Sequence, residues 1–232
     1  APLIERAKPH SEVIEISFTG VDYGYDAGVG HCFGRSLTLD QIKNLEVLLV
    51  YEMNGQPLLP QHGAPLRIIV PGWYGMASVK WLKKVEALTE PFLGFQQTQT
   101  YRFRQSADDE GQPVTSMRVK SLMVPPGVPD WISRNRCIEP GKITVNGRAW
   151  SGAGKKITKV EFASNGNWEA AEILDQVGKF AWTGWRYHWD AKPGEHILQC
   201  RASDESGETQ PITPPGISLA LAITLFNLSQ FL

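Results

Sequence analysis

Short apolar runs alternate with polar and turn-forming residues along the first half of the chain, a pattern typical of strands. Val13–Phe18 (VIEISF) has the period-two alternation of a strand, and the glycine-rich stretch TGVDYGYDAGVGHCFG that follows predicts a loop. Glu46–Met53 and Leu66–Val70 are apolar runs that favour strands, and Ser78–Leu88 predicts a strand or a short helix. Ser36–Lys43 has the start and the spacing of a short helix. Many short strands are therefore expected here.

The pattern changes near residue 130. The stretch VPPGVPDWISRNRCIEPG, around Val124–Pro140, is rich in proline and predicts a linker or a domain edge. Beyond it, short alternating segments are separated by turn residues: KITVNGRAW, KITKVEFASNGNW, FAWTGWRYHW and HILQCRASD. This spacing favours an antiparallel β-sandwich of roughly 100 residues. We therefore expect two domains, residues 1–128 and residues 129–232.

Composition places the chain among ordinary globular proteins. Of its 232 residues 42% are hydrophobic and 20% are charged, and the formal net charge is −1. A charge so close to zero gives no general attraction to nucleic acid or anionic lipid, so neither is expected as a partner. Cys32, Cys137 and Cys200 are too few and too scattered for a disulfide framework, and no C-x-x-C pair indicates zinc. The sequence also holds no haem motif of the type C-x-x-C-H.

Three basic residues lie among glycines, prolines and bulky apolar residues, where an unpaired charge is costly. Arg67 is inside LRIIV, which predicts a buried strand, and a buried guanidinium needs an anionic partner or a full set of acceptors. A salt bridge to a nearby carboxylate is one explanation. His62 in a Pro/Gly loop and Lys80 after the turn WYGMAS favour another, since donors beside glycines can hold a phosphate or an oxyanion.

Four short motifs in the same region, YEMNGQPL, QHGAPLR, VPGWYG and SVKWL, closely resemble the sulfite oxidase family of molybdopterin enzymes in their order and spacing. The resemblance extends more loosely over nearly the whole chain. It implies an α+β, mainly β fold, in which the C-terminal portion of a molybdopterin-binding domain precedes an immunoglobulin-like sandwich that forms a homodimer. The segments AWSG at Ala149–Gly152 and SNGNW at Ser164–Trp168 resemble parts of that second domain.

The resemblance implies that several residues hold the molybdenum-molybdopterin cofactor. His62 and Arg67 fall where the family binds the pterin and its phosphate, and Asp22 in the GVD segment matches an aspartate that bonds the pterin. Such a ring system offers donors and acceptors to Asp and His, and its phosphate suits Arg and Lys. A further segment that matches the family's cofactor contacts contains Ser78, Val79 and Lys80.

Tyr101, in QTQTYRF, falls at the family's tyrosine whose hydroxyl points toward the molybdenum centre. The resemblance therefore implies a catalytic role, because a phenol beside the metal can hold an oxo or water ligand and pass a proton. Taken alone, Tyr101 is typical of a half-buried strand residue, Asp22 of a turn and His62 of a solvated loop. Their common register with residues 51–82 favours the cofactor site.

The resemblance predicts no metal ligand within this chain. The family binds molybdenum through one cysteine in a motif upstream of the GVD segment, and we expect the chain to begin after that motif. Cys32, in GHCFGR, lies after Asp22, where the family has no metal ligand, and is not assigned to the metal. The family's substrate-binding arginines are also expected upstream. The chain is therefore expected to be incomplete and inactive by itself.

The end of the chain departs from the family pattern. The family typically continues Pro-Pro-Trp-Asn after the sandwich strands, whereas here Pro214 and Pro215 precede GISLALAITLFNLSQFL. One lost base in the coding DNA would explain this ending, so we predict that residues 216–232 are a frameshifted segment that fits the sandwich poorly. Its apolar part, Ile217–Leu232, is shorter than the ~20 residues that span a bilayer, so no membrane partner is expected.

The resemblance implies an enzyme that oxidises sulfite or a related small oxyanion by oxygen-atom transfer at molybdenum and passes electrons to an acceptor such as a cytochrome. The alternative is a non-catalytic β-sandwich module for dimerisation or interaction. A carbohydrate-binding module is disfavoured, because it leaves residues 51–82 unexplained and because Trp150, Trp168 and Trp182 are better assigned to the sandwich core. The exact substrate and the compartment, periplasmic or cytoplasmic, do not follow from the sequence.

Overall fold

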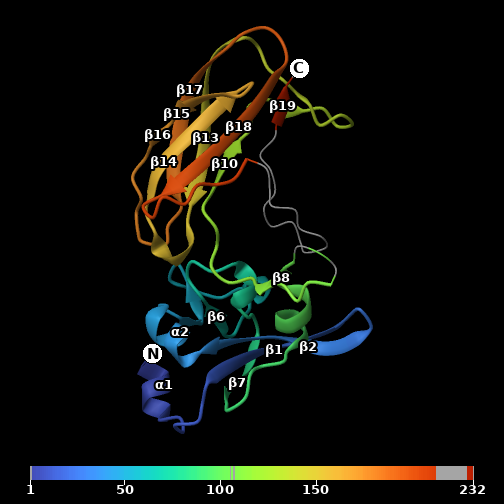
Figure 1. The fold of residues 1–232 in the computed structure, drawn as a ribbon, viewed down its shortest axis with the longest axis vertical. Helices are drawn as coiled ribbons and strands as arrows, with labels where there is room; N and C mark the ends of the chain where they lie inside the picture. Colours follow the sequence, from blue (N-terminus) through green and yellow to red (C-terminus); the bar gives the residue numbers. More distant parts are fainter. Residues whose placement is uncertain (1, 105, 107, 213–228, 232) are drawn as a thin grey trace. The chain divides into compact units, whose positions relative to one another are not determined.

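The computed structural model describes residues 2–104, 106, 108–212 and 229–231, and these form two compact units (Figure 1). The N-terminal unit extends to Ser116 and the C-terminal unit begins at Met117. Strands outnumber helices in both, so the expected α+β, mainly β fold class is confirmed. No helix in the described part of the chain has the length and apolar character needed to cross a membrane.

The N-terminal unit is built around a three-stranded antiparallel sheet in the order β2-β1-β7. The strands of this sheet are β1 (Glu15–Asp26), β2 (Val29–Thr38) and β7 (Leu82–Leu88). Three two-stranded sheets pair β3 (Leu48–Val50) with β6 (Arg67–Ile69), β4 (Glu52–Met53) with β5 (Gln56–Pro57), and β8 (Arg102–Phe103) with β9 (Gln112–Pro113). The helical elements are α1 (Pro2–Ala7), α2 (Leu39–Asn44), the short turns η1 (Pro60–His62) and η2 (Gly75–Ala77), and the π-helical η3 (Gln96–Thr100).

The glycine-rich stretch after Phe18 forms a long hairpin, so the prediction of a loop there is wrong. β1 continues to Asp26 and pairs with β2 from Val29 onward. The two turn residues, Ala27 and Gly28, have φ angles of 47° and 79°, and two positive φ values define the tight turn that matches the twist of a hairpin. The sequence did not reveal these strands near the turn, because both of their faces are largely exposed there and no alternation of apolar and polar residues is required.

The short helix predicted near Ser36–Lys43 is confirmed as α2, which begins at Leu39. The Thr38 side chain accepts a hydrogen bond from the Gln41 N–H at 3.1 Å, and Gln41 Oε1 accepts one from the Thr38 N–H at 2.9 Å. This capping box satisfies two donors that a helix start leaves open. The helix contributes Ile42 to a core whose other buried members are Val13, Ile16, Phe18, Leu37, Ile68, Val70, Ala77 and Val79.

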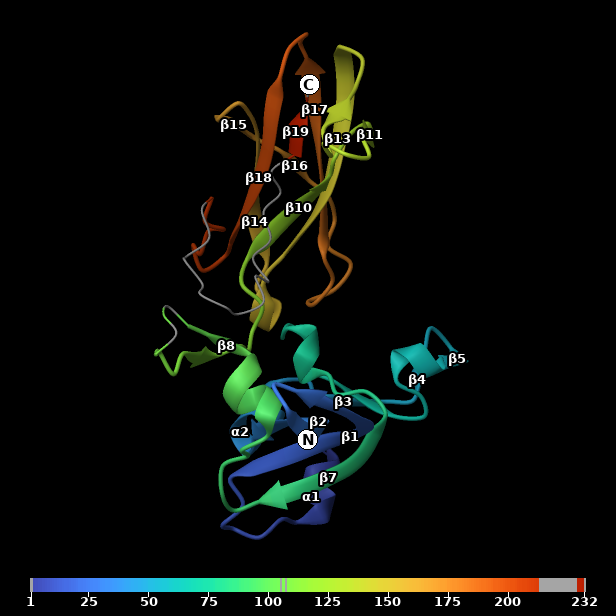
Figure 2. The same cartoon turned by 90° about the vertical axis from the view of Figure 1, so that its right-hand side faces the viewer.

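The C-terminal unit is a sandwich of two sheets, seen edge-on in Figure 2. One sheet has the order β10-β13-β17-β16, with β10 (Lys120–Val124), β13 (Gly141–Trp150), β17 (Thr183–Ala191) and β16 (Glu172–Ile173). The other has the order β11-β12-β19-β18-β14-β15, with β11 (Val128–Pro129), β12 (Arg136–Cys137), β19 (Ser229–Phe231), β18 (His196–Asp204), β14 (Ile157–Ser164) and β15 (Asn167–Ala170). A single turn, η4 (Gly152–Gly154), precedes β14.

The tryptophans of the sandwich core differ from those predicted. Trp185 is fully buried and Trp189 is 7% exposed. Trp182, by contrast, is 50% exposed and stacks on the half-buried Trp150, while Trp168 lies under the guanidinium of Arg201. The assignment of Trp150, Trp168 and Trp182 to the core is therefore wrong, because strand register places these rings at the margins of the sheets.

The predicted misfit of residues 216–232 concerns a segment that lies outside the described residues except for Ser229–Phe231. Those three residues form β19, which pairs antiparallel with β18 and parallel with β12. The frameshift hypothesis stays a prediction.

Candidate functional site

Asp22 lies at an irregular point of the central strand. The register of β1 shifts between Thr19 and Tyr23, which is the signature of a β-bulge, and bulges often redirect a side chain beside a functional site. Asp22 Oδ1 is buried and has no hydrogen-bond partner. A Cβ atom on Gly20 would lie 2.2 Å from this oxygen and 2.8 Å from the backbone oxygen of Lys80. The glycine therefore allows Asp22 to approach the segment that carries Lys80.

Arg67 joins two loops through their backbone carbonyls. Its Nη1 donates to the His62 oxygen at 2.9 Å and its Nη2 to the Ser78 oxygen at 3.0 Å. Among the described residues it makes no ion pair with a carboxylate, so the salt-bridge explanation finds no support there. Partial burial lowers the pKa of Arg67 from its ordinary value. The guanidinium is therefore a fixed positive charge whose position is set by main-chain acceptors.

His62 and Lys80 are held beside each other by a glycine in the left-handed region. Gly63 has a φ of 99°, and a Cβ atom at this position would lie 2.8 Å from Lys80 Cβ. Lys80 Nζ donates to the Gln61 oxygen at 2.8 Å, which leaves donor hydrogens of the ammonium group for another acceptor. His62 Nδ1 is buried without a partner. The close packing at Gly63 explains why the QHG segment needs glycine after the histidine.

Ser78 and Val79 serve mainly to build this arrangement. The Ser78 hydroxyl accepts a hydrogen bond from the Val70 N–H at 3.1 Å, and its carbonyl accepts from Arg67. Val79 is 1% exposed, and its carbonyl accepts from the Ile68 N–H at 2.9 Å. The Val79 side chain belongs to the core, so any contact of this residue with a ligand would use its backbone.

Tyr101 follows an unusual turn. Its N–H donates to the Gln96 oxygen at 3.0 Å, which closes the π-helical turn η3, and such turns are frequent at functional sites. The half-buried ring meets Phe33 of β2 edge-on with centroids 6.4 Å apart. The Val114 N–H donates to the backbone carbonyl oxygen of Tyr101 at 3.0 Å. Tyr101 is thus placed against β2 by contacts on both sides.

A hollow of about 200 Å³ lies beside Asp22, on the hairpin of β1 and β2. Its lining includes Asp22, Phe33, His31 and Gln96, and Phe33 is the residue that contacts the Tyr101 ring. Gln96 Nε2 lies 3.0 Å from His31 Nε2. Sequence reasoning missed His31, Phe33 and Gln96, because they become neighbours only through the hairpin that was predicted to be a loop.

The structure therefore brings His62, Arg67 and Lys80 together through the carbonyls of their loops and the close approach at Gly63. Asp22 lies across Gly20 from the Lys80 backbone, and Tyr101 is linked to the hollow beside Asp22 only through its contact with Phe33. The two buried atoms without partners, on Asp22 and His62, suit the ring nitrogens of a pterin, and the missing side chains of Gly20 and Gly63 let Asp22 and Lys80 pack where they do. The residues present therefore fit the cofactor that the sequence implies.

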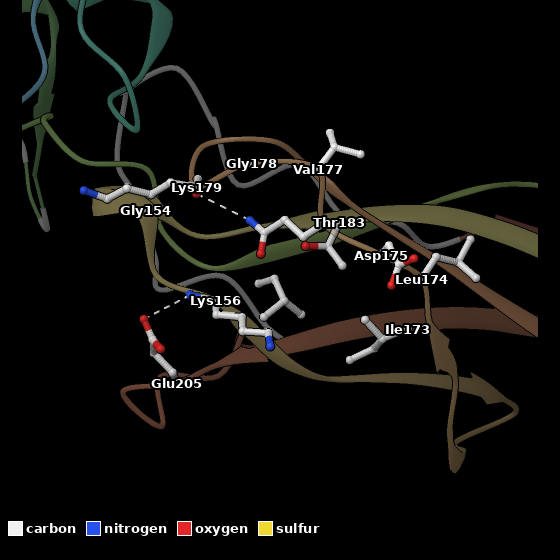
Figure 3. Close-up of a pocket in the computed structure, with 12 residues that line it drawn as sticks. Gly154, Lys156, Ile173, Leu174, Asp175, Val177, Gly178, Lys179, Thr183 and Glu205 are labelled. Carbon is white, nitrogen blue, oxygen red and sulfur yellow. Dashed lines mark hydrogen bonds between the residues drawn. The ribbon is translucent and has the colours of Figure 1, made fainter.

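A larger pocket of about 730 Å³ lies in the C-terminal unit (Figure 3). The Lys156 N–H donates to Glu205 at 3.1 Å and Gln176 donates to the Lys179 oxygen at 3.4 Å, as the dashed lines show. Its lining mixes both signs of charge, with Asp175 opposite the lysines, and contains no predicted site residue. Volume alone therefore does not identify the functional site. The described residues contain no group of three His, Cys, Asp or Glu side chains placed to hold a metal.

Comparison with known families assigns both halves of the chain. Residues 1–96 match the model of the oxidoreductase molybdopterin binding domain, and residues 112–219 match that of the Mo-co oxidoreductase dimerisation domain. These matches place the chain in the class of molybdopterin-dependent oxidoreductases.

Individual relatives show which family within this class the chain resembles. The chain is 33% identical over 217 residues to mitochondrial sulfite oxidase of Mus musculus, a match that covers 85% of this chain and 38% of that protein. It is 31% identical over 228 residues to the NADH nitrate reductase of Ulva prolifera, covering 84% of this chain and 25% of that protein. The crystal structure of the sulfane dehydrogenase SoxCD from Paracoccus pantotrophus matches with a TM-score of 0.78 and 27% identity, over 99% of this chain and 56% of that chain. The chain belongs to the sulfite oxidase family and spans well under two thirds of the length of these relatives.

Proposed function

We propose that this chain supplies the cofactor-holding and dimer-forming parts of an enzyme that oxidises sulfite or a related small oxyanion by oxygen-atom transfer. The bound molybdenum-molybdopterin would supply the two-electron chemistry. The observation that carries the proposal is the pair of buried, unpartnered polar atoms, Asp22 Oδ1 and His62 Nδ1, beside the basic groups of Arg67 and Lys80. Buried polar groups are rarely left unpaired, so a ligand with matching donors and acceptors is their natural partner.

Each residue has a defined part in this proposal. Asp22 and His62 would bond the pterin ring, while Arg67 and Lys80 would hold its phosphate through donor hydrogens that the backbone carbonyls leave open. Ser78 and Val79 would position the segment that carries Lys80. Tyr101 would exchange a proton and a hydrogen bond with the reacting oxygen.

The match of residues 112–219 to a dimerisation domain supports a homodimer. The printed names of the relatives, sulfite oxidases and a sulfane dehydrogenase, together support a small sulfur compound as the substrate, and the sulfite oxidases favour the oxyanion sulfite. We further propose a cytochrome as the electron acceptor. The non-catalytic dimerisation module is the weaker reading, because it leaves the unpaired groups of the N-terminal unit without a purpose.

The test is retention of the cofactor by variants of the native protein produced in cells that make molybdopterin. We expect Lys80→Met to lower the pterin and molybdenum content about tenfold, because a charge-assisted contact to the phosphate is lost. Lys83→Met is the matched control, since Lys83 is exposed on the neighbouring strand β7. Equal cofactor content in the two variants, measured by pterin fluorescence and elemental analysis, would refute the assignment of Lys80.

A further inference from the structure

Arg35 of β2 is a buried cation without a counter-charge. Arg35 is only 3% exposed, and its Nε and Nη1 atoms are buried with no hydrogen-bond partner. The remaining nitrogen, Nη2, makes one long contact of 3.4 Å to the Val114 oxygen. Within the described part of the chain no carboxylate forms an ion pair with it. Guanidinium groups in protein interiors are normally paired with anions or other acceptors. An unpaired Arg35 therefore lowers the stability of the folded protein, which calls for a functional explanation.

The positive charge persists at neutral pH in spite of the burial. Desolvation lowers the pKa of Arg35 to about 10, and the electrostatic influence of Tyr101 acts in the opposite direction. Because this value lies well above neutrality, Arg35 remains protonated under physiological conditions. The N-terminal unit therefore keeps a buried positive charge on the strand that packs against Tyr101.

Several contacts link the strand segment of Arg35 to Tyr101. Phe33 and Arg35 are two residues apart on β2 and share one face of the strand, and Phe33 meets the Tyr101 ring. The Val114 backbone carbonyl accepts from Arg35, and the Val114 N–H donates to the backbone carbonyl of Tyr101.

Gln97 of the π-helical turn η3 forms hydrogen bonds with Ser36, the residue after Arg35 on β2. It accepts from the Ser36 N–H at 3.0 Å and donates to the Ser36 hydroxyl at 2.8 Å. The strand that carries Arg35 and the turn that leads into Tyr101 are thus tied together. A fixed separation is what a preorganised electrostatic contact requires, since no reorganisation is then needed during the reaction.

We propose that Arg35 is a positioning residue that acts through Tyr101, favouring negative charge on the phenol oxygen while the phenolic proton is shared with, or passed to, an acceptor in the site. The proton returns to the phenol oxygen when the cycle closes, so no other reactant is consumed. This inference rests on the proposed role of Tyr101. It assigns no contact with substrate to Arg35, whose unpartnered nitrogens are buried.

The first test separates this role from a structural one. We expect Arg35→Met to leave the unfolding midpoint of the protein in denaturant unchanged or to raise it, because methionine fills similar space without an unpaired charge. Arg201→Met is the matched control and should lower the midpoint, because Arg201 Nε donates to Glu161 at 2.7 Å. A fall for Arg35→Met as large as that for Arg201→Met would show that Arg35 is a structural residue and overturn the proposal.

The second test is a double-mutant cycle in the native enzyme. We expect Arg35→Met to lower kcat about tenfold with little change in KM, and Arg35→Lys to restore part of the loss by keeping the charge. In a Tyr101→Phe background the same Arg35→Met change should alter kcat less than about twofold, because the group it acts on is gone. An equal effect of Arg35→Met in both backgrounds would refute the coupling.

The outcomes also distinguish the inference from the function on which it rests. If Tyr101→Phe leaves kcat unchanged, the proposed role of Tyr101 fails and the inference about Arg35 fails with it. If Tyr101→Phe lowers kcat but Arg35→Met does not, the proposed function stands and only the inference about Arg35 is wrong.

Discussion

The two units of the chain treat their buried ionisable groups in opposite ways. In the N-terminal unit, buried atoms of Asp22, Arg35 and His62 have no hydrogen-bond partner. In the C-terminal unit, Glu161 is bonded by Arg201 and Lys159, each at 2.7 Å. A protein whose only requirement was stability would pair these groups in both units. The contrast is confined to ionisable groups, since buried atoms of Thr183 and Trp185 in the sandwich also lack partners, and it supports the proposal that the N-terminal unit keeps charged groups for a ligand.

Asp204 shows how completely the sandwich satisfies a buried carboxylate. It is 2% exposed, and its two oxygens accept from the hydroxyls of Ser151 at 2.7 Å and Ser206 at 2.6 Å and from the Ser206 N–H at 2.9 Å. Burial by itself would raise the pKa of Asp204, but these hydrogen bonds outweigh it and hold the pKa below its ordinary value. Asp22, by contrast, has one oxygen that receives no bond at all.

The largest expected effect comes from removing a core ring of the sandwich. Trp185→Ala should lower the free energy of unfolding of the C-terminal unit by about 3–5 kcal/mol, because the fully buried indole leaves a cavity. The ring packs so closely on Gly147 that a Cβ atom there would lie 2.1 Å from it. Denaturant titration measures the loss. Trp182→Ala is the control, and with its ring 50% exposed it should cost about 1 kcal/mol or less. Equal losses would contradict the observed burial.

A smaller effect is expected at the satisfied carboxylate. Asp204→Asn should lower the free energy of unfolding at neutral pH by about 1–3 kcal/mol, because the amide cannot accept all the hydrogen bonds from Ser151 and Ser206. Since the folded-state pKa of Asp204 is lowered, its contribution is complete above the ordinary carboxyl range and is lost as the pH falls through the folded value. The gap between the two proteins should therefore close in acid. A gap independent of pH would disprove this account.

The smallest change in stability is expected at the unsatisfied carboxylate. Asp22→Asn should alter the free energy of unfolding by less than about 1 kcal/mol, because no hydrogen bond to the buried oxygen is lost. The pterin content of the native protein should nevertheless fall several-fold. Thermal unfolding and pterin fluorescence of the same preparation provide the two measurements. A large loss of stability with full cofactor content would assign Asp22 to the scaffold and remove the contrast between the units.

Local patterns in the sequence predicted the elements whose signals are confined to a few neighbouring residues. The start and spacing of Ser36–Lys43 are one such signal, and the alternating segments of the sandwich are another. The hairpin of β1 and β2 was missed because these strands are rich in glycine and face solvent over much of their length. Their composition therefore does not show the apolar alternation of a half-buried strand. The tryptophans were misassigned because Trp150 ends β13, Trp182 precedes β17 and Trp168 lies on the edge strand β15, and side-chain alternation alone does not reveal these marginal positions.

Most of the residues proposed for the site could be named before the fold was known, but their surroundings could not. Short motifs with fixed spacing identified His62, Arg67 and Lys80, since a loop that must hold a polar ligand needs particular residues at particular separations. Nothing in the neighbourhood of Arg35 along the chain indicated a buried cation. Its contacts come from Val114, far along the chain, and its electrostatic neighbour is Tyr101.

By itself, then, the sequence determined the family, the mainly β class and the basic residues of the cofactor segment, because each depends on spacing within short stretches. Only the tertiary structure decided which polar atoms are buried without partners, which tryptophans form the core and which cation lies behind Tyr101. The physical reason is that burial and pairing are properties of residues distant along the chain, which become neighbours only when the strands are in register.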